Sequence, residues 1–327
     1  SKYIAVVYIK ETGAYVRQLG EMLVISKNGE TLQKIPISYI EHLVVIGNVQ
    51  ITSQALKKIL ECGCDISYLT YGGKYIGQTS ANNSKNIFLR LAQYEWYNCE
   101  EKRMELARCI VDSKIKKQIA MIQSFQWKES KYDWQSDVAQ MNKMLEILKL
   151  KTDSNEIMGV EGFCSTIYFG AFSQMLKGIV EFKTRNRRPP RDPVNALLSL
   201  GYTFLTKDMC NLIEGESFEP YLGFLHGVRY GRKSLALDMI EEFRQPVIDR
   251  FIMYLFKNEI MTEKDFRSEI DGVFLENESF GKFCKEYEKW MCGEQEFRNK
   301  MKLQCQRLKR TIQFGEVYET YHGNVEE

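Results

Sequence analysis

The feature that most constrains the fold is a change in hydrophobic periodicity near residue 86. Residues 88–126 contain neither glycine nor proline, and their apolar side chains recur every three or four positions. That spacing places the apolar side chains on one face of an α-helix. Upstream, short stretches rich in Val, Ile and Tyr alternate with polar breaks such as Lys27-Asn28-Gly29, a pattern typical of strands joined by tight turns. The chain therefore combines a β-rich beginning with a helical remainder.

The predicted fold class is α+β. Strands are expected at residues 4–9, 15–19, 22–26, 32–35, 43–46, 66–70 and 74–77, and one short helix at 54–62. Further helices are expected at about 157–182, 194–213, 235–256 and 280–314. Residues 79–86 are polar and without periodicity, which indicates a linker. We expect a small N-terminal β-sheet domain with one short helix (1–80), a linker (81–90) and a larger all-α C-terminal domain (91–327).

Composition excludes several classes of protein. Hydrophobic residues make up 44% and charged residues 27%, as in ordinary globular domains, and the net charge of +2 gives no global sign of a nucleic-acid partner. No apolar run reaches the roughly 18 residues of a membrane span, and no signal peptide opens the chain, so a cytoplasmic location is expected. The nine cysteines form no CxxC pairs, which argues against a zinc ribbon or a disulfide framework.

One of the three histidines stands in an unusual context. His42 lies within a strand-like run and His322 in a polar tail, whereas His226 is flanked by glycines and precedes a predicted helix. On that helix Asp238 and Glu241 are three residues apart and share a face, while Glu242 turns away. An imidazole with carboxylates is a hard donor set that suits Mg²⁺ or Mn²⁺. A solvated helix face beside a packed histidine is the alternative, and spacing alone leaves both open.

A basic loop precedes another predicted helix. Five cations fall within the nine residues 183–191 and are interrupted by two prolines. Asp192 is placed to cap the following helix, with Pro193 in its first turn. Arginine forks bind phosphate oxygens in pairs, so the loop suits a nucleic-acid backbone, although a solvated charge run is the alternative. The candidate nucleic-acid-binding residues here and after His226 are Arg185, Arg187, Arg188, Arg191, Arg229, Arg232 and Lys233.

Together these motifs resemble the CRISPR-associated protein one family. The likeness is carried by RNRRPPRDPVNALLSLGY and GFLHGVRYGRKSLALDMIEEFR, by Gly-Val-Glu161-Gly upstream, and by the run at 39–48 in the β-rich part. It extends over nearly the whole chain. In detail the sequence is most similar to the subtype I-C branch, whose members often work with a partner exonuclease.

The resemblance implies a metal-dependent DNA endonuclease and integrase. Such a protein inserts short foreign DNA into a repeat array by attack of a 3′-hydroxyl on a phosphodiester. The implied ligands of Mg²⁺ or Mn²⁺ are Glu161, His226 and Glu241, with Asp238 as a further acidic residue of the catalytic site. Many relatives have Asp at the position of Glu241, so this chain departs there by one methylene. The implied assembly is a homodimer formed through the β domain, with two such dimers bridged by CRISPR-associated protein two.

Two other functions stay open on the sequence. One is a general metal-dependent nuclease of branched DNA or RNA, which would use the same acidic site. The other is a non-catalytic DNA-binding scaffold whose acidic cluster is structural. Asn195 and Tyr202 also match family positions, where they either contact DNA or pack.

Overall fold

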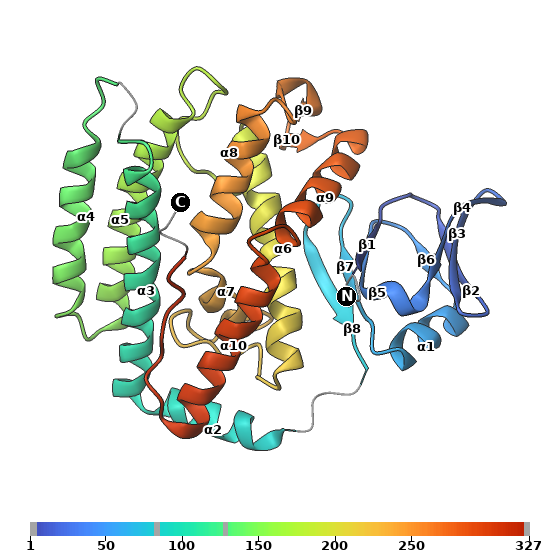
Figure 1. The fold of residues 1–327 in the computed structure, drawn as a ribbon, viewed down its shortest axis with the longest axis horizontal. Helices are drawn as coiled ribbons and strands as arrows, with labels where there is room; N and C mark the ends of the chain where they lie inside the picture. The colour runs from blue at the N-terminus through green and yellow to red at the C-terminus, as the bar shows by residue number, and fades with distance from the viewer. Residues whose placement is uncertain (1–4, 82–85, 127–129, 324–327) are drawn as a thin grey trace. The chain divides into compact units, whose positions relative to one another are not determined.

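The computed structural model describes residues 5–81, 86–126 and 130–323 (Figure 1). The chain divides into two compact units, Ser1–Asn83 and Ser84–Glu327. The first is rich in strands and the second in helices, which confirms the predicted α+β class. Of the expected linker at 81–90, residues 82–85 lie outside the described residues, and residues 87–90 belong to the first helix of the second unit.

The N-terminal unit contains two four-stranded sheets. In one, of order β1-β5-β7-β8, the first three strands are parallel and β8 is antiparallel to β7. In the other, of order β4-β3-β2-β6, the first three form an antiparallel meander and β6 runs parallel to β2. The elements are β1 (Ala5–Ile9), β2 (Tyr15–Leu19), β3 (Met22–Lys27), β4 (Glu30–Pro36), η1 (Ile37–Tyr39), β5 (Ile40–Ile46), β6 (Gln50–Ile51), α1 (Ser53–Glu61), β7 (Asp65–Leu69) and β8 (Tyr75–Thr79).

One hydrophobic core serves both sheets and α1. Val16 and Leu23 of the meander pack in the same cluster as Leu43 of β5 and Ile59 of α1, and all four are fully buried. The apolar run of β5 is continuous because this strand lies inside its sheet, with residues buried on both faces. His42 of β5 is buried too, and its ring nitrogen lies 2.7 Å from the hydroxyl of Ser67 on β7, so this histidine is structural.

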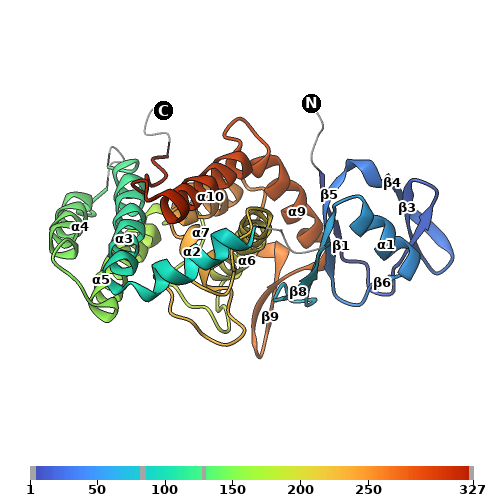
Figure 2. The ribbon, with the colours of Figure 1, turned by 90° about the horizontal axis from the view of Figure 1, so that it is seen from below.

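The C-terminal unit is mainly helical. Helices α3, α4 and α5 pack against one another, and α10 lies along α2 and α6 (Figures 1 and 2). Its elements are α2 (Ile87–Asn98), α3 (Glu100–Gln123), α4 (Trp134–Leu148), α5 (Ser154–Met175), α6 (Pro193–Gly215), α7 (Ser234–Ile240), the π-helix η2 (Arg244–Asp249), α8 (Arg250–Lys257), η3 (Glu263–Asp265), β9 (Phe266–Glu269), β10 (Gly272–Leu275), α9 (Asn277–Met291) and α10 (Phe297–Phe314). Within the described ranges, no helix combines the length and apolar character needed to cross a bilayer.

The structure interrupts three of the long helical patterns. The run 88–126 breaks at Cys99, whose backbone is extended. The pattern at 235–256 contains the π-helix, because Pro246 has no amide hydrogen with which to continue the α-helical ladder. The pattern at 280–314 breaks before Glu296, which has a left-handed backbone.

The helical unit also contains a β-hairpin that the sequence pattern did not predict. Strands β9 and β10 pair antiparallel through the turn Ile270-Asp271, and Gly272 is the first residue of β10. Gly272 has a φ of +136°, a backbone conformation that disfavours other residues. The Asp-Gly turn signal is local and short, and the helical patterns on both sides of it dominated the prediction.

Gly201 allows α6 to approach the π-helix closely. A Cβ at this position would lie 2.7 Å from Cγ2 of Ile248. We therefore expect Gly201→Ala to lower the free energy of unfolding by about 1–3 kcal/mol through overpacking. Gly170 on α5 is the matched control, because a Cβ there meets no atom within 4 Å. Gly170→Ala should raise the free energy of unfolding by about 0.5–1 kcal/mol through helix propensity. Urea denaturation measures both, and equal changes would contradict the close approach.

Candidate active site

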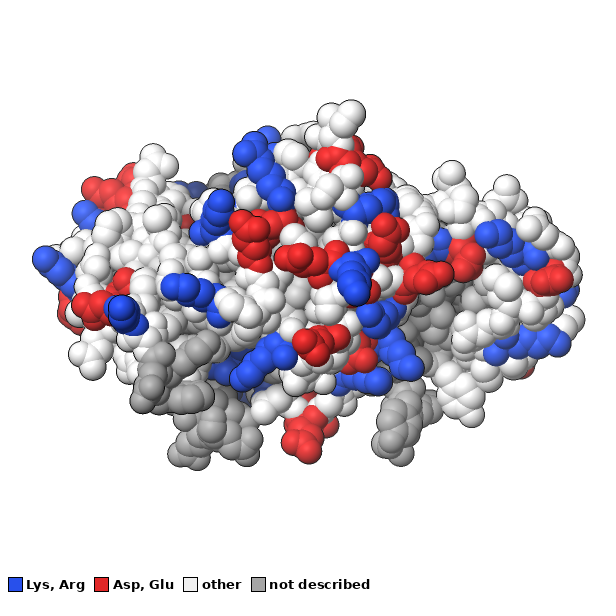
Figure 3. Space-filling view, turned by 90° about the horizontal axis from the view of Figure 1, so that it is seen from above, with Lys and Arg blue, Asp and Glu red and all other residues white. Residues whose placement is uncertain are grey.

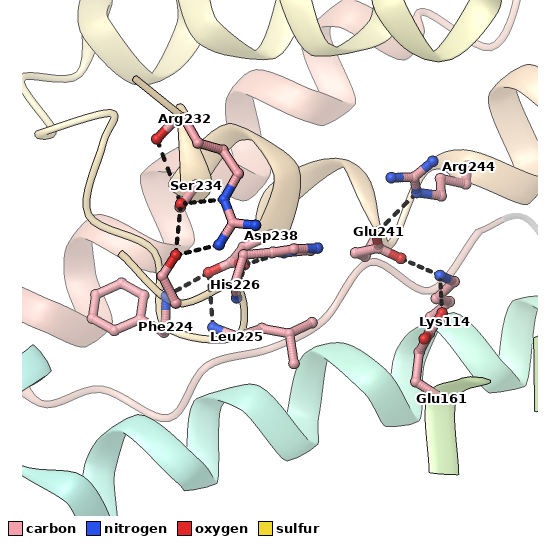
Figure 4. Close-up of polar contacts among 11 residues, drawn as sticks. Lys114, Glu161, Phe224, Leu225, His226, Arg232, Ser234, Asp238, Glu241 and Arg244 are labelled. Carbon is pink, nitrogen blue, oxygen red and sulfur yellow. Dashed lines mark hydrogen bonds and ion pairs between the residues drawn. The ribbon is translucent and has the colours of Figure 1, made fainter. Parts of the chain in front are cut away.

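The carboxylate of Asp238 holds His226 in place. Asp238 is fully buried on α7. Its Oδ2 accepts the amide hydrogens of Phe224 (2.5 Å) and Leu225 (3.0 Å), and its Oδ1 accepts that of His226 (2.8 Å) and lies 2.7 Å from His226 Nδ1 (Figure 4). A carboxylate only accepts hydrogen bonds, so Nδ1 carries the hydrogen, and in the neutral ring Nε2 keeps its lone pair. This is the arrangement of a metal-binding histidine oriented by an acid.

A second cluster joins three helices. Glu161 comes from α5, Glu241 follows the last residue of α7, and Lys114 comes from α3. The ammonium of Lys114 lies 2.5 Å from Glu161 Oε1 and 2.5 Å from Glu241 Oε2 (Figure 4). Arg244 Nε donates to Glu241 Oε1 at 3.0 Å, and the Ser165 hydroxyl donates to Glu161 Oε1 at 3.0 Å. Two acids that are far apart in the sequence thus meet around one lysine.

Glu241 is ionised despite its burial. Burial raises the pKa of this carboxyl, but interactions with Arg244, Lys114 and His226 outweigh it and bring the pKa to about 2. Glu241 Oε2 is buried, and the ammonium of Lys114 contacts it at 2.5 Å.

The four predicted acidic and histidine residues come together, although not as a preformed metal cage. In the described part of the chain, no three His, Cys, Asp or Glu side chains are grouped so as to hold an ion directly. Glu161 and Glu241 meet through Lys114, while Asp238 is fully occupied by backbone amides and His226. Two carboxylates and one imidazole with a lone pair on Nε2 still fit the donor preferences of Mg²⁺ or Mn²⁺. Asp238 acts through His226.

Asn195 shapes the basic loop. Its side-chain oxygen accepts hydrogen bonds from Arg185 (2.8 Å) and from the amide of Asn186 (2.9 Å). Its side-chain nitrogen donates to the carbonyl of Thr184 (2.9 Å) and to Asp192 (2.6 Å). The Asp192 carboxylate also caps α6 by accepting the amide of Asn195 at 2.7 Å, which confirms the predicted N-cap. Asn195 is fully buried and therefore packs.

The candidate phosphate-binding cations fall into two groups. Arg185, contrary to the expectation of a surface contact, is half-buried and also donates to Ser199 at 3.1 Å. Arg232 is bonded to Ser234, and Lys233 is paired with Glu214 at 3.0 Å. These three residues make polar contacts within the chain, although the buried Nε of Arg185 has no acceptor among the described residues. The exposed members are Arg187, Arg188, Arg191 and Arg229.

Comparison with known proteins identifies the family. Residues 7–289 match the family model described as CRISPR associated protein Cas1. The chain belongs to the Cas1 family. It is 33% identical over 287 residues to CRISPR-associated endonuclease Cas1 3 of Thermus thermophilus, covering 87% of this chain and 84% of that protein. The likeness stated from the motifs is thereby confirmed, while the subtype I-C branch stays a prediction.

Two further similarities extend this result. A CRISPR-associated exonuclease Cas4/endonuclease Cas1 fusion of Geobacter sulfurreducens is 30% identical over 293 residues, which cover 87% of this chain and 52% of the fusion. A casposase bound to integration product has the same fold, with a TM-score of 0.86 at 21% identity, covering 99% of this chain and 96% of the casposase.

In this Cas1 chain Tyr202 helps to hold the side chains of the candidate site in position. The hydroxyls of Tyr202 and Tyr168 each donate to the buried carboxylate of Asp249 at 2.5 Å. The guanidinium of Arg244 lies over the Tyr202 ring, 4.6 Å from its centroid, and reaches Glu241 from there. Tyr202 therefore packs, and it fixes the arginine that orients Glu241. The sequence pattern did not reveal Lys114, Arg244 and Asp249, because each lies within a helical pattern that predicts only a buried or an exposed face.

The surface charge of this Cas1 chain is mixed. On the face shown in Figure 3, Lys and Arg side chains are interspersed with Asp and Glu, as the net charge of +2 suggests. Charges of one sign therefore do not dominate this face.

Asp238→Asn tests the support of His226. In this variant a side-chain NH₂ group would replace one carboxylate oxygen and face the backbone N–H groups that now donate to it. Those buried backbone amides would then have no acceptor. We expect the free energy of unfolding to fall by about 1–3 kcal/mol or more. Asp271→Asn, in the exposed turn of the β9–β10 hairpin, is the control and should change stability little. Urea denaturation followed by circular dichroism measures the difference, and equal stability of the two variants would refute the buried acceptor role.

Proposed function

We propose that this Cas1 chain is a metal-dependent DNA endonuclease and integrase that inserts short foreign DNA into a CRISPR repeat array. The observation that carries the proposal is the convergence of Glu161, His226 and Glu241 from separate elements onto one part of the helical unit. Membership of a family whose relatives are named CRISPR-associated endonucleases supports it.

The chemistry assigned to the site is exchange of one phosphodiester for another. The 3′-oxygen of the incoming strand forms a bond to the repeat phosphorus, and the bond from that phosphorus to the displaced 3′-oxygen breaks. The hydroxyl proton is lost and the leaving oxygen gains one, so no external energy source is needed. A bound Mg²⁺ or Mn²⁺ would neutralise charge that develops on the phosphate.

The chain's own residues have separate roles in this scheme. Glu161, Glu241 and His226 Nε2 would hold the ion, while Asp238 orients the imidazole and Arg244 orients Glu241. The side chains of Glu161 and His226 are 16% and 18% exposed, compared with 4% for Glu241. DNA would therefore approach from the side of Glu161 and His226.

The proposal includes the partners of the chain. DNA is held along its backbone by the exposed arginines of the basic loop and by Arg229. Two copies of the chain form a homodimer through the β unit, CRISPR-associated protein two bridges two such dimers, and the protein acts in the cytoplasm. A partner exonuclease fits the existence of a Cas4/Cas1 fusion among the relatives.

The scaffold alternative has one observation in its favour. The carboxylates of Glu161 and Glu241 are already paired with Lys114 and Arg244, as in a purely structural ion-pair network. A general nuclease would use the same residues, with water in place of the 3′-hydroxyl.

A joining assay separates the three functions. A labelled DNA duplex and a repeat-bearing plasmid are incubated with the protein and Mg²⁺ or Mn²⁺. Joined products are expected from the parent, and Glu161→Gln, His226→Ala or Glu241→Gln should each reduce joining by about 100-fold or more while the protein stays folded, since a bound metal stabilises the transition state by several kcal/mol. Glu156→Gln is the control, because Glu156 is exposed on the same helix as Glu161.

The other outcomes of this assay identify the alternatives. Shortened strands without joined products would point to a general nuclease. A parent protein that yields neither joined nor shortened strands would point to the non-catalytic scaffold. Unchanged activity in all three site variants would contradict the metal site.

The basic loop is tested by the salt dependence of DNA binding. A variant in which Arg187, Arg188 and Arg191 are all alanine should bind DNA more weakly. The slope of log affinity against log salt concentration should become shallower by about 0.9 for each DNA phosphate that the variant no longer neutralises. A matched variant replaces the exposed Lys131, Lys143 and Lys149. Equal slopes for the two variants, measured by fluorescence anisotropy, would show that the loop does not contact the DNA backbone.

A further inference from the structure

Lys114 holds a position that the proposed function does not use. Its ammonium lies 2.5 Å from one oxygen of Glu161 and 2.5 Å from one oxygen of Glu241, and it is the cation that brings these carboxylates together. We propose that Lys114 is a placeholder cation, which occupies the metal position between Glu161 and Glu241 and has to be displaced before a divalent ion binds. This inference rests on the proposed metal-dependent function.

The first argument is one of space. A Mg²⁺ ion bonds oxygen ligands at about 2.0–2.1 Å. An ion bonded to the two oxygens that Lys114 now contacts would lie well within the contact distance of the Lys114 nitrogen. The ammonium and the ion therefore exclude each other, and binding is an exchange of one cation for another.

The second argument is one of charge. Glu241 is almost fully buried, and each of its oxygens faces a cation, Arg244 on Oε1 and Lys114 on Oε2. Without Lys114, the buried carboxylate of Glu241 would lie near that of Glu161 with less compensation, which is costly in a protein interior. Lys114 lets the metal-free chain fold with both carboxylates charged and in place. The same ion pairs lower metal affinity, because an incoming ion has to replace them.

The neighbouring lysine on α3 provides a contrast. Lys117 lies one helical turn from Lys114, and its ammonium donates to the Ser113 hydroxyl at 2.6 Å and to the carbonyl of Tyr321. It makes no ion pair with Glu161 or Glu241 among the described residues. Both side chains are long and flexible, so the difference between them is the partner that each ammonium holds. Of these two lysines, Lys114 is the one placed to compete with a metal ion.

The test is direct titration of the full chain with Mn²⁺, without DNA. Free Mn²⁺ is followed by electron paramagnetic resonance in the parent, in Lys114→Met, and in Lys114→Gln, which keeps a polar group without the charge. Both Lys114 variants should bind Mn²⁺ at least about tenfold more tightly, the change that corresponds to about 1.4 kcal/mol. Their melting temperatures should also rise more than that of the parent on saturation with Mn²⁺. Lys117→Met should match the parent in Mn²⁺ affinity.

The outcomes separate this inference from the proposed function. If the Lys114 variants unfold without Mn²⁺ and fold with it, the placeholder role is supported. If the parent and both Lys114 variants bind equally, and Glu161→Gln abolishes binding, the placeholder is refuted while the metal site stands. If no protein in the series binds Mn²⁺, the placeholder and the metal-dependent function both fail.

Discussion

A carboxylate that is buried in a protein interior has to be compensated by hydrogen-bond donors or cations, and this requirement organises the centre of the helical unit. Asp238, Glu241, Glu242 and Asp249 follow one another closely in the chain, and all are almost completely buried. Each takes its compensation from a different place. Asp238 binds backbone amides and His226, Glu241 binds Arg244 and Lys114, and Asp249 binds two tyrosines. Through these contacts the acids connect α3, α5, α6 and the loop before α7 to the segment that runs from α7 through the π-helix η2.

Glu242 is compensated by residues that follow α10, near the end of the described chain. Its carboxylate accepts the hydroxyl of Tyr318 and, at 2.9 Å, the amide of Tyr321. The ring of Tyr321 stacks on Phe243, with centroids 4.6 Å apart. Glu242 thus faces away from the proposed ligands, as its helical position suggests, and fixes the segment after α10 against α7. Burial raises the pKa of the Glu242 carboxyl above its usual value, because the hydrogen bonds from Tyr318 and Tyr321 and the charge of Lys117 do not outweigh it. At Glu241 the neighbouring cations do outweigh burial.

Hydrophobic periodicity was sufficient to predict the α+β class and nearly all strands of the N-terminal unit. It failed where a break leaves the pattern of apolar residues intact, as at Cys99 between α2 and α3 or in the π-helix around Pro246. The strands of the β9–β10 hairpin are too short to form a recognisable alternation. Pro246 and the Asp-Gly pair of the hairpin are local signals that the surrounding helical periodicity outweighed in the prediction, whereas nothing in the apolar pattern marks the break at Cys99.

The candidate site was predictable to the extent that its residues have a characteristic spacing. His226, Asp238 and Glu241 stand out through a histidine between glycines and an acidic pair on one helix face, and Glu161 through the family motif. Lys114 was not predictable, since α3 also contains Lys116 and Lys117, and only the packed structure shows which ammonium reaches the acids. The partial burial of Arg185 was not predictable either, because its place in a basic run does not reveal its bonds to Asn195 and Ser199.

The proposed metal chemistry depends on His226 binding the divalent ion through Nε2, with Glu161 and Glu241 as the other ligands. The most direct measurement is the electron spin echo modulation of the Mn²⁺-loaded chain, which detects nitrogen nuclei bonded to the metal. We expect a nitrogen coupling from one imidazole that disappears in His226→Ala and persists in Asp271→Asn. A Mn²⁺ signal without nitrogen coupling, or with coupling unchanged in His226→Ala, would contradict this ligand set.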